Sequence, residues 1–231
     1  MYGARQHESM VTNKMNSLLS KPEKSGSLPK SRFTAMLIDA NALDQGGFDC
    51  WLFCPGMLFN SADKWWGDFG RRNAPHEGLD LFLYRDRAGK TRRLGLDTRI
   101  PVMQNGVVKA VIKDYLGHAV IIEHECPGSD TGRLTAFYAH TIPRPSIAAG
   151  TVVKAGDIIA TLAGTGNSKS KILPHLHLSL GLPSSSFSYE KFFWNMFRDP
   201  AMLVLLDPLG MLDRPYQTLE TSNTGELLAN P

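Results

Sequence analysis

The sequence predicts a mostly-β protein, with an antiparallel two-sheet core, an N-terminal extension and a short C-terminal helical segment. Two observations support this fold class. From about residue 73 to 183, short β-branched runs alternate with glycine and other turn residues, a pattern typical of a sandwich or barrel-like core. After Pro183 the pattern changes, and residues 188–198 are expected to form a helix that begins at Ser188 and ends before Pro200.

The expected strands follow one another through the central region. From 79 to 84, a leucine at every second position alternates with Asp80, Phe82 and Tyr84, a period of two that is typical of a strand. A turn at 114–117 separates two β-branched runs and indicates an antiparallel pair. The remaining expected strands are 107–112, 119–124, 135–138, 151–153, 157–162 and 175–180.

The chain divides into four segments by composition. Residues 1–31 are rich in lysine and serine without periodicity, so a mobile polar tail is expected. Residues 32–72 contain clusters of large apolar residues and are expected to be an extension packed on the core. Within this extension, Trp65-Trp66 favours packing over a role in a substrate groove. Residues 73–183 form the expected core, and residues 184–231 the C-terminal helix and tail.

Composition bounds the class of protein but does not select a function. The chain has 231 residues, 42% of them hydrophobic and 20% charged, with a net charge of +3, as expected for one globular domain with extensions. No apolar run reaches the ~20 residues that cross a membrane, and the first 31 residues lack the apolar core of a secretory signal. Localisation is therefore left open, and nothing in the composition indicates a nucleic-acid partner. The pair Cys50 and Cys54 is expected to be buried thiols or a local disulfide rather than a metal site.

Four histidines and one aspartate fall at spacings typical of a zinc site: His76, Asp80, His140, His175 and His177. Strand residues two apart emerge on the same face, so His175 and His177 are expected to face one site. Pro75 and Gly78 disfavour a helix around His76, so a loop running into a strand is expected, with Gly78 permitting the bend.

The chemistry of this set suits a catalytic metal. Catalytic zinc sites take three nitrogen or oxygen ligands from the protein and leave the fourth position to water. Two imidazoles and one carboxylate provide that number, and the remaining histidines can transfer protons. The helical His-Glu-x-x-His pattern of other zinc peptidases is absent from the sequence.

The order of the motifs resembles the LytM/lysostaphin-type zinc metalloendopeptidase family, whose members cut peptidoglycan peptides and share the duplicated hybrid motif fold. The resemblance covers about residues 73–183. It rests on His76-Glu77-Gly78-Leu79-Asp80, Val120-Ile121-Ile122-Glu123-His124, Tyr138-Ala139-His140, the Gly150–Ile159 turn, Gly164-Thr165-Gly166 and His175-Leu176-His177.

The resemblance implies a role for each matching position. His76, Asp80 and His177 would bind one Zn²⁺ ion, and His140 and His175 would be the catalytic acid/base pair. It also implies a peptidoglycan or other peptide substrate and a location in the cell envelope or outside the cell. The assignment of base and acid between His140 and His175, the oligomeric state and the bond that is cut stay open.

Two other functions are compatible with the sequence. One is a non-catalytic module that binds peptidoglycan or activates another hydrolase, although such modules typically lose zinc ligands, which this chain keeps. The other is an intracellular metallohydrolase with a different substrate, an alternative raised by the missing signal segment. Bound zinc would argue against the first of these, and cell fractionation would test the second.

Overall fold

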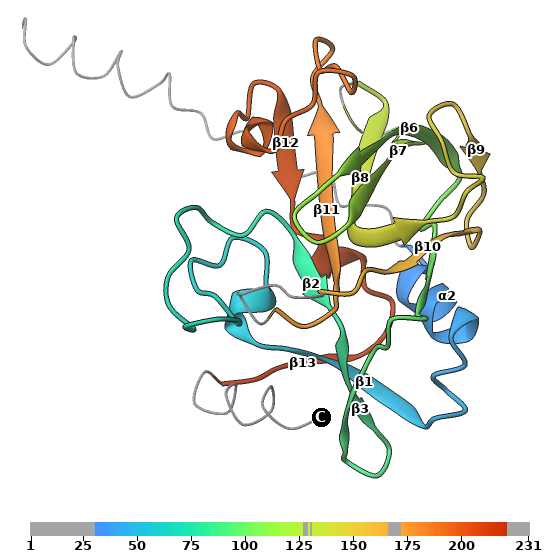
Figure 1. The fold of residues 1–231 in the computed structure, drawn as a ribbon, viewed down its shortest axis with the longest axis vertical. Coiled ribbons are helices and arrows are strands. Elements are labelled where there is room, and N and C mark those ends of the chain that lie inside the picture. The colour runs from blue at the N-terminus through green and yellow to red at the C-terminus, as the bar shows by residue number, and fades with distance from the viewer. Residues whose placement is uncertain (1–30, 127–128, 130, 166–171, 221–231) are drawn as a thin grey trace, which may run out of the picture.

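A computed structural model describes residues 31–126, 129, 131–165 and 172–220 of the chain. Within these residues the strands form two sheets, of nine and four strands, which confirms the predicted mostly-β class (Figure 1). None of the described helices is long and apolar enough to span a membrane. The expected polar tail at 1–31, apart from Ser31, lies outside the described residues, as do Gly166 of the Gly164–Gly166 turn and residues 221–231.

The larger sheet contains the expected central strands. Its main path runs β12-β11-β8-β7-β6-β9, while β10 pairs with β5 and β8, and β2 pairs with β11, all antiparallel. Its strands are β2 (Leu79–Leu81), β5 (Arg99–Pro101), β6 (Gly106–Lys113), β7 (His118–Glu125), β8 (Arg133–Pro143), β9 (Val152–Val153), β10 (Ile158–Leu162), β11 (Leu176–Pro183) and β12 (Leu203–Leu206).

Strand register brings the predicted site together. β11 lies between β2 and β8, so that His177 is directly opposite Asp80 on one side and Ala139 on the other. Residues directly opposite on antiparallel strands have Cβ atoms about 4.5–5.5 Å apart. Two residues almost a hundred positions apart in the sequence are therefore neighbours because of hydrogen bonding between strands.

The smaller sheet pairs a strand from the N-terminal extension with a strand near the C-terminal end of the described residues. Its order is β13-β1-β3-β4, with bounds Tyr216–Thr218, Phe48–Phe53, Leu83–Asp86 and Thr91–Arg93. β1 belongs to the expected N-terminal extension, and it pairs antiparallel with β3. The pair β1–β13 is parallel, which departs from the antiparallel pattern of the rest. β12 and β13 lie in the segment that the sequence described only as helix and tail.

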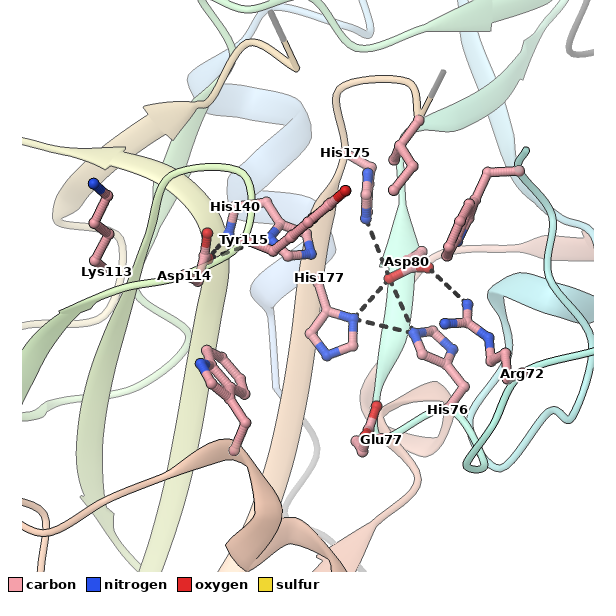
Figure 2. Close-up of a pocket in the computed structure, with 13 residues that line it drawn as sticks. Arg72, His76, Glu77, Asp80, Lys113, Asp114, Tyr115, His140, His175 and His177 are labelled. Atoms are coloured by element: carbon pink, nitrogen blue, oxygen red, sulfur yellow. Dashed lines mark hydrogen bonds and ion pairs between the residues drawn. The ribbon is translucent and has the colours of Figure 1, made fainter. Parts of the chain in front are cut away.

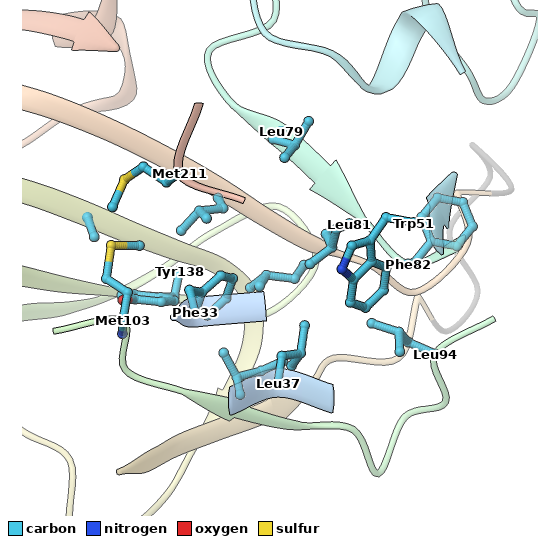
Figure 3. Close-up of a cluster of buried hydrophobic side chains, with 14 of the residues drawn as sticks. Phe33, Leu37, Trp51, Leu79, Leu81, Phe82, Leu94, Met103, Tyr138 and Met211 are labelled. Carbon is cyan, nitrogen blue, oxygen red and sulfur yellow. The ribbon is translucent and has the colours of Figure 1, made fainter. Parts of the chain in front are cut away.

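The extension also packs on the core through α2 (Phe33–Ala40). The Phe33 ring contacts Tyr138 of β8 edge-on at 6.2 Å between centroids, and Leu37 lies in the same buried cluster (Figure 3). Cys50 and Cys54 are buried thiols without a disulfide, one of the two arrangements expected. A short 3-10 helix, Pro55–Met57, follows β1 in the extension, and another, Pro208–Met211, follows β12 in the C-terminal segment.

The expected helix at 188–198 is much shorter in the structure, where a 3-10 helix spans Trp194–Arg198. The reason is the burial of aromatic residues on either side of Ser188. Phe187 and Tyr189 are both buried against the second hydrophobic cluster, which includes Phe137 of β8. Residues two apart share a face in extended chain and not in a helix, so this packing favours the extended form.

Candidate metal centre

All five predicted site residues line one cavity of about 630 Å³ (Figure 2). The cavity lies beside the start of β11, and its walls come from five separate parts of the chain. Its lining residues are Trp66, Arg72, His76, Glu77, Asp80, Lys113, Asp114, Tyr115, His140, Ile172, His175, His177 and Trp194. The structure thus brings the five residues together, while their individual roles stay predictions.

Three side chains converge on a common point. His76 Nε2 lies 3.1 Å from Asp80 Oδ1 and 3.1 Å from His177 Nδ1, and that nitrogen lies 2.8 Å from the same Asp80 oxygen. Among the described residues this His-Asp-His group could hold a metal ion. Ligands at 2.0–2.1 Å from a tetrahedral zinc ion are about 3.3 Å apart, close to the separations in this triangle.

The tautomer of His76 also suits a metal. Its Nδ1–H donates to the Leu58 carbonyl oxygen at 3.0 Å, so Nε2 of the neutral ring carries a lone pair. That lone pair faces a carboxylate oxygen and a second imidazole nitrogen at hydrogen-bonding distance. His177 Nε2 pairs with Ser179 Oγ at 2.9 Å, which directs its Nδ1 to the same point. A cation between the three atoms would be coordinated by all of them and would offset the repulsion between their lone pairs.

Burial makes the electrostatics of the site strong. His76, Asp80, His175 and His177 are all buried. Burial would raise the pKa of Asp80, but electrostatic interactions with His76, His175 and His177 outweigh this effect and hold the pKa well below its usual range. Burial lowers the pKa of His177, which keeps its imidazole neutral as a ligand must be. The donor set therefore offers one carboxylate oxygen and two imidazole nitrogens, all of which are ligand atoms that zinc accepts.

His175 lies just outside the triangle. Its Nδ1–H donates to the Leu173 carbonyl oxygen at 2.7 Å, and its Nε2 is 3.6 Å from Asp80 Oδ1. Burial, partly offset by Asp80, lowers the pKa of His175 to about 3. The ring is therefore neutral at physiological pH and has a lone pair on Nε2.

His140 is directed into the cavity by a β-bulge. Ala139 and His140 of β8 together oppose Ala119 of β7, because the register shifts between the pairs His118–Thr141 and Val120–Tyr138. His140 has a φ of 64°, in the left-handed region that is uncommon outside glycine. Bulges next to functional sites commonly redirect a side chain in this way.

Asp114 holds the bulged histidine in place. One oxygen of this buried carboxylate accepts hydrogen bonds from the His140 backbone N–H at 2.7 Å and from Nδ1 at 3.2 Å. Burial would raise the pKa of Asp114, but the hydrogen bonds and charge of His140 lower it to about 2. The carboxylate is thus ionised and fixes Nδ1 of His140 as a donor. The sequence indicated Asp114 only as part of a turn.

Several contacts to the site were not predicted. Trp65 Nε1 donates to Asp80 Oδ2 at 2.6 Å, and Arg72 lies 3.6 Å from the same oxygen. The expectation that Trp65-Trp66 packs rather than lines a groove holds for buried Trp65, whereas Trp66 lines the cavity. His124 is buried away from the cavity, where its Nδ1 pairs with the Asn105 carbonyl at 3.0 Å.

Gly78 allows the loop of His76 and Asp80 to approach β11. A Cβ at this position would lie 2.4 Å from the Leu178 carbonyl oxygen and 2.7 Å from Ser179 Oγ. We expect Gly78→Ala to lower the free energy of unfolding by about 1–3 kcal/mol, as for other forced overpacking, and to weaken metal binding. Urea denaturation measures the effect. The matched control is Gly210→Ala, where nothing lies within 4 Å of the added Cβ. Equal midpoints for the two variants would contradict the prediction.

Comparisons with known proteins agree with these motifs. Residues 85–186 match the model of Peptidase family M23, a range that includes His140, His175 and His177 but not His76 or Asp80. Three solved structures illustrate the likeness. The antimicrobial peptidase lysostaphin from Staphylococcus simulans is 23% identical, with a TM-score of 0.37, over 59% of this chain and 43% of its own. CbpA from L. salivarius REN is 19% identical, with a TM-score of 0.43, over 71% of this chain and 97% of its own.

The third structure is a putative glycyl-glycine endopeptidase LytM from Ruminococcus gnavus. It is 21% identical, with a TM-score of 0.38, over 62% of this chain and 50% of its own. The present chain therefore spans less than half of the lysostaphin chain and half of this LytM chain. The match over residues 85–186 makes this part of the chain similar to Peptidase family M23, in agreement with the LytM/lysostaphin-type resemblance of its motifs.

Proposed function

We propose that the chain is a zinc metalloendopeptidase that hydrolyses peptide bonds in peptidoglycan. The observation that carries the proposal is the triangle of His76 Nε2, Asp80 Oδ1 and His177 Nδ1, with separations of 2.8–3.1 Å. These three residues would hold the ion. A zinc ion bound there lowers the pKa of a water ligand to about 7 and so supplies a nucleophile at neutral pH.

The two remaining histidines handle protons. The lone pair on His175 Nε2 makes this nitrogen the acceptor for the proton of the attacking water, because Nδ1–H is held by Leu173. His140 Nε2 takes the opposite role, as the donor of a proton to the substrate. The Asp114 carboxylate stabilises the protonated form of the His140 ring, which then stabilises negative charge on the substrate carbonyl oxygen and protonates the leaving amine.

The cavity walls favour an extended peptide. Three aromatic side chains, Trp66, Tyr115 and Trp194, line the cavity, and Tyr115 is 74% exposed at the turn between β6 and β7. Arg72 and Lys113 add positive charge to the lining and Glu77 adds negative charge, so that both termini or side-chain charges of a short peptide find a partner. Together with the family match, this lining supports peptidoglycan peptides as the substrate class, and thus action in the cell envelope or outside the cell.

Metal removal tests the proposal directly. We expect the purified protein to release soluble peptides from cell-wall sacculi, and dialysis against a chelator to abolish this activity because the water loses its activating ion. Added Zn²⁺ should restore it. The readout is chromatography of released muropeptides, with His118→Ala, on the exposed end of β7, as a control that keeps full activity. Cleavage that continues without metal would contradict the proposal.

The alternative of a non-catalytic wall-binding module makes the opposite prediction. Such a module would be purified without metal and would bind sacculi without cleaving them. The retention of all five site residues in one cavity favours the enzyme. Chelator-sensitive cleavage of an unrelated peptide, without action on sacculi, would instead favour a metallohydrolase with another substrate.

A further inference from the structure

The two oxygens of Asp80 have different partners. Oδ1 faces His76 Nε2 and His177 Nδ1 (Figure 2). Oδ2 instead accepts a hydrogen bond of 2.6 Å from the indole Nε1–H of Trp65. Arg72 lies 3.6 Å from Oδ2 on the same side. Trp65 is 1% exposed and Asp80 is 2% exposed, so water does not compete for these contacts. The carboxylate is therefore fixed with a single oxygen directed at the predicted ion.

The same part of the chain also fixes His76. The Leu58 carbonyl accepts the His76 Nδ1–H at 3.0 Å, and this contact sets the tautomer that exposes Nε2. Two backbone hydrogen bonds hold the residue on either side: Asn60 N–H donates to the His76 carbonyl at 2.8 Å, and His76 N–H donates to the Ser61 carbonyl at 2.9 Å. Two of the three predicted ligands are thus oriented by residues 58–72, which we call the holding segment.

The holding segment has its own fixed shape. The Arg72 guanidinium donates to the Asp63 and Gly56 carbonyls, each at 3.0 Å, and so closes the segment into a loop. A Cβ on Gly56 would lie 2.6 Å from the Trp65 backbone nitrogen, so the backbone at Gly56 packs closely against the backbone at Trp65. The Trp65 ring packs on Phe82, 4.8 Å between centroids, and edge-on against His175. The indole therefore reaches Asp80 from a rigid position.

We propose that Trp65 and Arg72 are positioning residues of the metal centre, and that the holding segment is needed for full zinc affinity. The inference rests on the proposed metal site and extends it to a segment that lies outside the range matched by the family model. Groups that orient metal ligands typically change metal affinity or activity by about 10–100-fold when they are removed. Without Trp65, Asp80 would have an unsatisfied buried oxygen and freedom to rotate away from the ion.

The test compares two buried tryptophans, of which only Trp65 has its indole N–H bonded to Asp80. Trp51 and Trp65 are both buried, but Trp51 Nε1 has no hydrogen-bond partner, whereas Trp65 Nε1 binds Asp80. Zinc affinity of the metal-stripped full chain is measured by competition with a chromophoric chelator. We expect Trp65→Phe to weaken zinc binding about 10–100-fold and Trp51→Phe to change it less than about twofold. Similar affinities for these two variants would overturn the inference.

A second pair keeps the test valid if Trp65→Phe does not fold. Arg72→Met removes the cation beside Asp80, whereas Arg71→Met removes an exposed ion pair of Arg71 with Asp63 at 2.9 Å. Of these two variants, we expect only Arg72→Met to bind zinc more weakly and to change the visible spectrum of the Co²⁺-loaded protein. Arg72→Lys should recover part of the zinc affinity. Equal affinities of the Arg71 and Arg72 variants would also overturn the inference. If the wild-type protein binds no zinc, the proposed metal centre itself is wrong. If the wild type and all variants bind zinc equally well, the metal centre stands and only the positioning role of Trp65 and Arg72 is wrong.

Discussion

Replacing Asp80 with alanine is expected to abolish stoichiometric zinc binding and to reduce peptide hydrolysis to the level of the chelator-treated protein. Asp80 Oδ1 is the one anionic donor of the triangle, at 2.8 Å from His177 and 3.1 Å from His76. Its removal leaves two neutral nitrogens in a buried cavity, with fewer ligands than a catalytic zinc site requires. Elemental analysis and release of muropeptides measure the two effects.

Two controls separate loss of the ligand from loss of the fold. Asp80→Asn keeps the size of the side chain and an oxygen for Trp65, and it should also lose zinc because the charge is gone. Asp68→Ala removes an exposed carboxylate in an ion pair with Lys64 and should keep full zinc content. Full zinc binding by folded Asp80→Ala protein would remove Asp80 from the ligand set.

Replacing His175 with alanine is expected to lower kcat by about 10²–10⁴-fold, the usual contribution of general acid–base catalysis, while zinc stays bound. His175 Nε2 lies 3.6 Å from Asp80 Oδ1 and outside the triangle of donors, so the ligands are intact in this variant. Its neutral ring accepts a proton in the proposed mechanism, and alanine cannot. Kinetics on a defined peptide, with metal content measured on the same sample, test both parts.

His140→Ala should behave in the same way, since this residue is held by Asp114 and not by the three predicted ligands. Because the two histidines act in one proton transfer sequence, the double variant should be little worse than either single one. His118→Ala provides the surface control. Loss of zinc together with activity in His175→Ala would instead make His175 a ligand, and unchanged kcat would exclude it from catalysis.

The sequence was sufficient to predict the central strands, because these depend on local pattern, and it singled out the four histidines and the aspartate that line the cavity. Alternation identified β2 and β11, and the two-residue spacing of His175 and His177 placed them on one face. The pairing of β2 with β11, which brings Asp80 opposite His177, is a long-range contact that no local pattern encodes. Only the resemblance to a family joined these motifs before the structure was known.

The contacts that orient the ligands could not be predicted for the same reason. The Leu58 carbonyl carries no sequence signal, since every residue has one, and Trp65 reads as an ordinary core residue. The bulge at Ala139 and His140 depends on the register of β7 and β8. The C-terminal helix was predicted too long because aromatic residues at 187 and 189 satisfy burial in extended chain.

Anomalous diffraction at the zinc absorption edge, from crystals of the full chain grown with zinc, tests the central claim most directly. The account predicts one strong peak in the cavity beside β11, about 2.0–2.2 Å from His76 Nε2, Asp80 Oδ1 and His177 Nδ1. A peak held by other side chains, or no peak in this cavity at saturating zinc, would contradict it.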